Sequence, residues 1–292
     1  MTADSPAAAG EQQDENGPRS ASADRGTDSD AGAPDPEVLL SLRGISKHFG
    51  PVIALDRVNL DVPPGRVTAL IGDNGAGKST LIKVIAGIHE SDAGEIYWSG
   101  ERVHIRNPHD ATELGVATVY QDLALCDNLD IVANMFLGLE VRKHGILNET
   151  PMELKARATL ADLSVTTVRS IRQPVGSLSG GQRQSVAVAR AIMSDAKLVI
   201  MDEPTAALGV TQTAMVLDLI RRLAASGIAV IVISHNLIDV FAVADRVAIL
   251  YLGRLVSAGP ASDYDRLSAV EIMTTGAQSQ RENGAAGPAT TP

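Results

Sequence analysis

The feature that most constrains how this chain can fold is a glycine-rich run of nine residues, Gly72-Asp73-Asn74-Gly75-Ala76-Gly77-Lys78-Ser79-Thr80. It follows an apolar, partly β-branched segment, Val67 to Ile71, and precedes an apolar segment with a helical pattern, Leu81 to Ala86. Glycines let successive backbone N–H groups turn towards one point, and the start of a helix adds the positive end of its dipole. The run therefore predicts an anion-binding loop between a strand and a helix, which is a unit of α/β folds.

The spacing of this run is that of a P-loop, which holds the phosphates of a nucleotide. In that interpretation Lys78 reaches the β- and γ-phosphates, and Ser79 offers its hydroxyl to Mg²⁺. A glycine turn that arises by chance is the alternative, but it has no reason to follow a strand and open a helix. The sequence thus predicts that residues 72–80 bind a nucleotide together with its magnesium ion.

Two acidic residues, Asp202 and Glu203, end the apolar strand predicted at Leu198 to Met201. An acidic pair after a strand is usually an ordinary turn or helix cap. In a sheet that also carries a P-loop, however, a metal ligand followed by a general base is favoured. We therefore expect Asp202 to hold Mg²⁺ through water and Glu203 to polarise the attacking water.

Gln121 and His235 also follow predicted strands, Val116 to Tyr120 and Ile228 to Ser234. By itself, such a Gln is most often a surface amide, and a His at a strand end is most often a structural hydrogen-bonding group. The strand ends at one edge of an open α/β sheet line its ligand crevice. We therefore expect both residues in the site, with Gln121 sensing the γ-phosphate through Mg²⁺ or water.

A second glycine-rich run lies about a hundred residues further along the chain, Leu178-Ser179-Gly180-Gly181-Gln182. It opens a predicted helix that continues through Val186 and Ile192, and the run itself has no charged residue. Such a helix start can complete a nucleotide site on another chain. Together the two runs predict an ATP-driven dimer that opens and closes.

The remaining pattern predicts the layers around these motifs. Strands and helices alternate up to a closing hairpin at residues 246–258, which implies a mainly parallel sheet wrapped by helices. Short apolar runs at 38–62 and a hairpin at 91–103 predict an antiparallel β layer. From about residue 122 the residue pattern is that of helices. One helix is expected to start with Thr150 as its cap, Pro151 as its first residue and Glu153 completing a capping box.

Composition narrows the class of protein. The chain has 292 residues and a formal net charge of −10, and its acidic balance argues against a nucleic-acid binder with a basic face. Residues 1–36, with eight acids and two arginines, read as a disordered acidic tail, and residues 276–292 as a second flexible tail. No apolar stretch approaches the ~20 residues that span a bilayer. The single cysteine, Cys126, is consistent with a reducing cytoplasm.

With these motifs the chain resembles the ATP-binding-cassette (ABC) ATPases over roughly residues 37 to 275. The most specific element is the run at 178–182, which matches the family's signature. The resemblance implies an α/β fold with a P-loop NTPase core, a mainly parallel sheet, an antiparallel β layer and a helical subdomain at about 122–178. It also implies ATP hydrolysis with Mg²⁺, a homodimer closed around two ATP molecules, and docking of the helical subdomain onto a membrane permease.

The resemblance also assigns roles to individual residues. Ser179 and Gly181 would contact the γ-phosphate bound to the opposite subunit, and Gln121 and His235 match the family's Q-loop and switch histidine. Phe49 matches the aromatic residue that stacks on adenine, although a core phenylalanine is the alternative. The expected site comprises catalytic Glu203, His235 and Gln121; metal-binding Ser79, Gln121 and Asp202; and nucleotide-binding Phe49, Gly72, Asp73, Asn74, Gly75, Ala76, Gly77, Lys78, Ser79, Thr80, Ser179, Gly180, Gly181 and Gln182.

Within the family, the wording of three segments resembles the ATPases of bacterial ribose, xylose and fructose importers: residues 72–75, 119–123 and 206–209. The resemblance implies a subunit at the cytoplasmic face of the membrane that energises a permease, with a periplasmic or lipid-anchored binding protein as an indirect partner. The alternatives are another cargo, such as an amino acid or an exported molecule, and a soluble ABC protein that acts on nucleic acid or ribosomes. That soluble class usually has two cassettes or a long coiled-coil insert.

One position departs from the family's pattern. The family usually has an aspartate where this chain has Gly209, at the end of Ala206-Ala207-Leu208-Gly209. The aspartate helps to fix the partner subunit's P-loop, so its replacement is expected to weaken dimerisation and basal ATP hydrolysis.

Overall fold

The computed structural model describes residues 37–163, 165, 168–193 and 195–277. The tail predicted at residues 1–36, and the tail predicted at 276–292 apart from its first two residues, lie outside the described residues. No helix in the described ranges is long and apolar enough to cross a bilayer.

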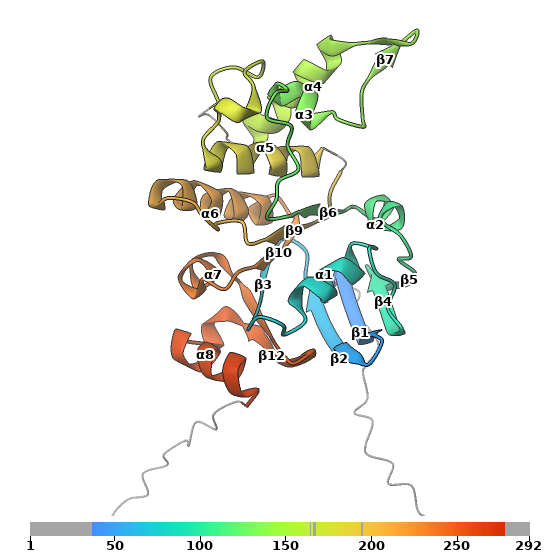
Figure 1. The fold of residues 1–292 in the computed structure, drawn as a ribbon, viewed down its shortest axis with the longest axis vertical. Helices are drawn as coiled ribbons and strands as arrows, with labels where there is room; N and C mark the ends of the chain where they lie inside the picture. The colour runs from blue at the N-terminus through green and yellow to red at the C-terminus, as the bar shows by residue number, and fades with distance from the viewer. Residues whose placement is uncertain (1–36, 164, 166–167, 194, 278–292) are drawn as a thin grey trace, which may run out of the picture. The chain divides into compact units, whose positions relative to one another are not determined.

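A six-stranded sheet in the order β12-β11-β3-β10-β9-β6 forms the centre of the described chain (Figure 1). Its pairings are parallel except for the β11–β12 hairpin, which confirms the mainly parallel sheet expected from the sequence. Alternate residues of β9 pack into two different cores, Val199 and Met201 into one and Leu198 and Ile200 into the other. The strands are β3 (Val67–Gly72), β6 (Val116–Val119), β9 (Leu198–Asp202), β10 (Ala229–Ile233), β11 (Arg246–Tyr251) and β12 (Arg254–Pro260).

An antiparallel sheet in the order β2-β1-β4-β5 forms the expected second β layer. Helix α1 (Lys78–Ile85) shares a core with it, in which Leu42 and Leu55 of the sheet pack with Leu81 and Ile85 of the helix. The strands are β1 (Leu40–Phe49), β2 (Val52–Val62), β4 (Ala93–Trp98) and β5 (Glu101–Val103).

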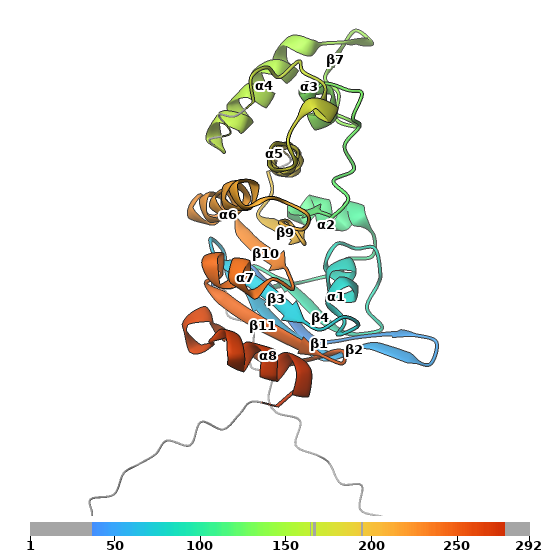
Figure 2. The same cartoon turned by 60° about the vertical axis from the view of Figure 1, so that its left-hand side comes forward.

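The helices on the other side of the central sheet lie in successive layers, with α6 next to the sheet, then α5, then α3 and α4 (Figures 1 and 2). The sequence did not predict α2 or α8. The bounds are α2 (Pro108–Leu114), α3 (Ile131–Met135), α4 (Glu149–Asp162), α5 (Gly180–Ile192), α6 (Val210–Ala225), α7 (Leu237–Val243) and α8 (Arg266–Thr275), with short 3₁₀ turns at Val175–Ser177 and Ala261–Asp263.

The segment expected to be helical, about 122–178, contains α3, α4 and a small hairpin of β7 (Arg142–Lys143) and β8 (Ile146–Leu147). The helix start predicted at Thr150 was wrong, because α4 begins at Glu149 after Asn148. Glu153 makes no capping box there. Its carboxylate accepts a hydrogen bond from Nε of Arg172 at 2.9 Å instead. Because the Arg172 guanidinium also binds other carboxylates nearby, these charge-assisted bonds outweigh a single cap bond.

Candidate nucleotide site

The glycine loop between β3 and α1 has a backbone that glycine adopts more easily than other residues. Gly75 and Gly77 have φ angles of 80° and 105°, in the left-handed region. A Cβ at Gly77 would lie 2.7 Å from the carbonyl oxygen of Ala54 in β2. The turn between β11 and β12 supports the loop from outside, since the N–H of Gly253 donates to the carbonyl of Ala76 at 2.9 Å. Both sheets therefore fix the shape of the predicted phosphate loop.

Lys78 begins α1 and turns its ammonium back onto the loop. Its Nζ donates to the carbonyl oxygen of Gly72 at 2.8 Å and to that of Asp73 at 3.0 Å. Burial lowers the pKa of Lys78, while the charges of Glu203, Asp73 and Asp202 act in the opposite direction. A half-buried cation whose hydrogen-bond partners are neutral carbonyls gains strongly from an anion, and the phosphate of a nucleotide supplies one.

Asp202, at the end of β9, is the carboxylate expected to act on a metal ion. Burial raises its pKa, and the neighbouring Glu203 raises it further, while Lys78 and Lys83 act in the opposite direction. A nearby divalent cation would offset the cost of this charge, so the residue fits Mg²⁺. Within the described ranges, no group of three or more His, Cys, Asp or Glu is arranged to hold a metal ion alone. An ion here would therefore need oxygens from a nucleotide and a hydroxyl such as that of Ser79.

Glu203 and His235 form the closest contact among the predicted catalytic residues. The Oε1 atom of Glu203 accepts from the backbone N–H of His235 at 3.2 Å and lies 2.8 Å from its Nδ1. The pairing of β9 with β10 explains why they meet, because Asp202 lies opposite Ile233, Glu203 is the next residue after Asp202, and His235 is the second residue after Ile233. The glutamate side chain is 17% exposed and the imidazole 74% exposed. The carboxylate is thus held in place, while the ring remains open to a ligand.

A cleft of about 290 Å³ joins three segments that are far apart in the sequence. Gln121 lines it from the loop after β6, Gly180 from the start of α5, and Glu203 from the end of β9. The structure therefore places the predicted glutamine and the predicted general base in one cleft, as the sequence implied for strand ends at one edge of a sheet.

The start of α5 is a fully formed helix cap. The hydroxyl of Ser179 accepts from the N–H of Gln182 at 3.4 Å, and the side chain of Gln182 accepts from the N–H of Ser179 at 2.9 Å. This reciprocal pair is a capping box. The glycine that follows the cap lies close to Leu208, before α6. The run 179–182 therefore presents an ordered helix N-terminus, the kind of end that attracts an anion.

Phe49 lies at the end of β1 and is 43% exposed. Its ring meets that of His89 edge to face, with centroids 5.2 Å apart, and Nζ of Lys47 lies 5.7 Å from its centroid. The ring is not a core residue, which removes the main alternative to a stacking role. That role stays a prediction.

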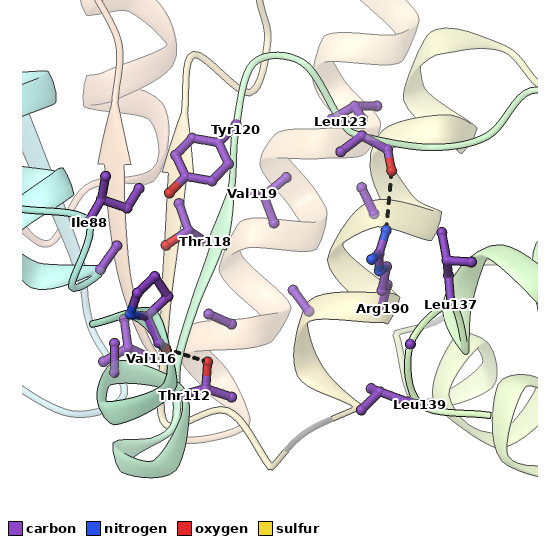
Figure 3. A pocket seen from close by; sticks show the side chains of 18 of the residues that line it. Ile88, Thr112, Val116, Thr118, Val119, Tyr120, Leu123, Leu137, Leu139 and Arg190 are labelled. Carbon is purple, nitrogen blue, oxygen red and sulfur yellow. Dashed lines mark hydrogen bonds between the residues drawn. The ribbon is translucent and has the colours of Figure 1, made fainter. Parts of the chain in front are cut away.

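A large apolar groove of about 530 Å³ lies beside Gln121 and was not predicted (Figure 3). It runs between β6 and α2 on one side and α5 and residues 137–139 on the other. Leu137 and Leu139 are 40% and 55% exposed. Arg190 closes one end, where its guanidinium donates to the carbonyl of Ala124 at 3.2 Å. Its lining comes from five separate segments, so no single stretch of the sequence indicated the groove.

The sequence also missed three polar residues behind the Glu203–His235 pair, Thr205, Asn236 and Asp239, which hydrogen-bond to one another. Thr205 and Asp239 are 34 positions apart, and no spacing rule connects a threonine in a loop to an aspartate in a helix. The pattern around Glu203 did identify the strand end on which they depend.

Known proteins of similar sequence are ABC proteins. The family model described as "ABC transporter" matches residues 55–206. The fructose import ATP-binding protein FrcA of Rhizobium meliloti is 48% identical over 84% of this chain and 97% of its own length. The xylose/arabinose import ATP-binding protein XylG of Sulfolobus acidocaldarius is 44% identical over 81% of this chain and 94% of its own.

Solved structures agree with the fold. A nucleotide-free ATP-binding cassette of an ABC transporter is 30% identical and superposes with a TM-score of 0.68, covering 76% of this chain and 91% of its own. An ABC cassette in its ADP conformation is 28% identical with a TM-score of 0.70, covering 82% of this chain and 95% of its own. The chain therefore belongs to the ATPases of the ABC transporter family.

Proposed function

We propose that this ABC ATPase energises the import of a monosaccharide through a separate membrane permease. The support for sugar as the cargo is that the relatives above are named for fructose and xylose/arabinose import and match nearly their full lengths. The contact that carries the ATPase chemistry is the bond between Glu203 and His235 at the strand ends next to the P-loop strand.

ATP binds along residues 72–80 in this proposal. The loop N–H groups and the dipole of α1 surround the phosphates, and the ammonium of Lys78 exchanges its two carbonyl partners for phosphate oxygens. Phe49 stacks on the adenine, because its ring is exposed beside the sheet that supports the loop. Ser79, Gln121 and Asp202 would hold Mg²⁺, which would supply positive charge to neutralise the phosphates.

Glu203 polarises the water that attacks the γ-phosphate. Two groups of His235, the backbone N–H and Nδ1, hold Oε1 of Glu203 in place. The carboxylate is therefore already oriented when it accepts a proton from the water. The exposed imidazole lies where it can contact the transferred phosphate. Gln121 shares the cleft with Glu203 and thereby links the γ-phosphate to the loop that borders the apolar groove.

Two copies of the chain complete each site in this proposal. Ser179 at the capped start of α5 is exposed, so this helix N-terminus can bind the γ-phosphate held by a second chain. The apolar groove with its exposed leucines is the surface for an apolar segment of the permease. Docking there places the chain at the cytoplasmic face of the membrane, with a sugar-binding protein on the opposite side.

The decisive test is ATP hydrolysis and ATP affinity of the purified full chain and two variants. Lys78→Ala removes a charge-assisted contact of about 1.5–3 kcal/mol, so calorimetry should show at least tenfold weaker ATP binding. Glu203→Gln should bind ATP like the wild type but hydrolyse it about a thousandfold more slowly, since the amide cannot take a proton. Asp218→Asn, on the exposed side of α6, is the control and should change neither quantity.

The cargo is tested separately. Vesicles that contain the permease encoded beside this chain, with its binding protein, should take up a monosaccharide only when ATP and this subunit are present. Uptake of an amino acid instead, or ATP-driven export, would leave the ATPase assignment intact and rule out a sugar as the imported cargo.

A further inference from the structure

The Glu203–His235 pair is part of a ring that hydrogen bonds and two short stretches of backbone close together. Glu203 binds His235 at one end of the ring. At the other end, the carboxylate Oδ2 of Asp239 accepts from the hydroxyl of Thr205 at 2.7 Å and from Nδ2 of Asn236 at 3.1 Å. The chain itself supplies the two remaining sides, because Thr205 lies two residues after Glu203 and Asn236 follows His235.

We infer that Asp239 is a positioning residue for hydrolysis, which fixes the loop of the general base against the loop of the histidine. This proposal rests on the ATPase function proposed above and adds a residue from α7 to it. In this inference Asp239 needs no contact with the nucleotide. It acts through Thr205 and Asn236, each of which is near one member of the Glu203–His235 pair in the sequence.

The burial of Asp239 supports a role beyond ordinary solvation. The residue is 8% exposed, and Thr205 is 9% exposed. Both donors to its Oδ2, a hydroxyl and an amide, are neutral. In the described part of the chain no lysine or arginine forms an ion pair with Asp239. The place of Asp239 in the first turn of α7 offsets part of the cost of its charge, but a buried carboxylate without a cation still depends on its hydrogen bonds to Thr205 and Asn236.

The backbone of Glu203 shows what the ring has to hold. Its φ angle is 49°, in the left-handed region that an L-residue rarely adopts. Such a conformation persists only where the surroundings enforce it. Asn236 is itself fixed at both ends, since its Oδ1 accepts from the N–H of Ile238 at 3.0 Å while its Nδ2 binds Asp239. The position of Asp239 in α7 is thereby transmitted to the loop beside His235.

The test compares Thr205→Val with Thr205→Ser in the purified full chain. Valine keeps the shape and loses the hydroxyl, so kcat should fall about tenfold or more while the Kd for ATP stays within about twofold. Serine keeps the hydroxyl and should retain most of the wild-type kcat. Asp239→Ala should reproduce the valine effect, and Asp218→Ala on the exposed face of α6 is its control.

A second comparison separates positioning from simple destabilisation. In a Glu203→Gln background, Thr205→Val should not lower the residual hydrolysis further, because the group that it positions is gone. A wild type that hydrolyses no ATP would reject the proposed function itself. If the wild type is active and Glu203→Gln is slow, equal kcat values for Thr205→Val and the wild type overturn the inference, as does a loss of kcat and ATP affinity together.

Discussion

The two glycine-rich runs use the same residue for two different physical reasons. In the P-loop, Gly75 and Gly77 have positive φ angles, so the backbone itself favours glycine. In the run that opens α5, Gly180 and Gly181 belong to an ordinary right-handed helix. What favours glycine there is space. A Cβ at Gly181 would lie 3.3 Å from Cβ and 3.4 Å from Cα of Gln212, and a Cβ at Gly180 would displace the end of the Leu208 side chain, 2.6 Å away. The P-loop glycines are required by conformation, with close approach added at Gly77, whereas the glycines of α5 are required by close approach alone.

The difference bears on what each run can do alone. The P-loop is fixed by both sheets and by Gly253, so its N–H groups are in place before a ligand arrives. The start of α5 is ordered by its own cap, by its packing on Leu208 and on Gln212 of α6, and by the ion pair of Arg183 with Asp127. We therefore expect substitutions in the P-loop to damage the single chain, and substitutions in the second run to damage mainly what two chains do together.

Gly77→Ala should give the largest effect and tests the conformational half of the comparison. The left-handed backbone and the close carbonyl of Ala54 together should cost about 2–4 kcal/mol of unfolding free energy. ATP binding should also be lost, because the N–H groups of the loop shift. Denaturant unfolding and calorimetric titration measure the two effects.

The matched control for this change is Gly145→Ala, in the β7–β8 turn. Gly145 has a φ of 81°, but nothing lies within 4 Å of an added Cβ. The free energy of unfolding of Gly145→Ala should therefore fall only by the cost of the left-handed backbone, about 1–2 kcal/mol, and its affinity for ATP should stay unchanged. Equal losses of stability in the two variants would show that the carbonyl of Ala54 does not restrict the loop.

Ser179→Ala should give an intermediate effect and tests the other half. It removes the N-cap of α5 and should cost about 1 kcal/mol of unfolding free energy, with ATP affinity of the single chain unchanged. Hydrolysis should fall by more than this loss explains if the serine also contacts the nucleotide on the second chain, as we propose. ATPase assays beside calorimetry separate these effects.

Asp265→Ala is the control, because Asp265 caps α8 in the same way. It should cost a similar amount of stability and leave kcat unchanged. If both variants lose kcat in proportion to stability, the start of α5 has only a structural role and the contrast between the two runs fails.

The sequence predicted those parts of the molecule in which a local pattern decides the structure. Strand ends that carry Asp202, Glu203 and His235 were placed correctly because β-branched runs and the glycine loop fix the parallel sheet. Contacts between segments that are distant in the sequence could not be predicted from local patterns. Glu153 looked like a capping residue in its own segment, yet it binds Arg172, which lies 19 residues away.

The same limit explains the parts of the site that were missed. The apolar groove is lined by segments from residue 86 to residue 191, and no one of them has an apolar pattern that indicates exposure. The ring that includes Asp239 also depends on tertiary packing, since it connects a loop after β9 to helix α7. Motifs therefore indicated the residues that we propose for the chemistry, while the residues that we propose to position them could be found only from the fold.

Gly209→Asp should give the smallest effect, and it sharpens the comparison because Gly209 belongs to neither class of glycine. Its φ is −74° and ψ is 163°, an extended conformation, and nothing lies within 4 Å of an added Cβ. Neither conformation nor space therefore requires glycine here. Gly209 is the N-cap of α6, where aspartate is preferred over glycine by a few tenths of a kcal/mol and its charge favours the helix dipole.

We therefore expect Gly209→Asp to stabilise the chain by about 0.5 kcal/mol, a rise in Tm of about 1–2 °C. If the carboxylate also supplies the contact between subunits that this chain lacks, basal ATP hydrolysis and the ATP-dependent dimer seen in sedimentation should increase as well. Gly209→Ala is the control, since it adds a Cβ without a cap or charge. Equal Tm values for the alanine and aspartate variants would rule out the cap. A higher Tm without more dimer would show that the aspartate only caps α6. The N-cap residue of α6 would then have no part in how two chains close around ATP.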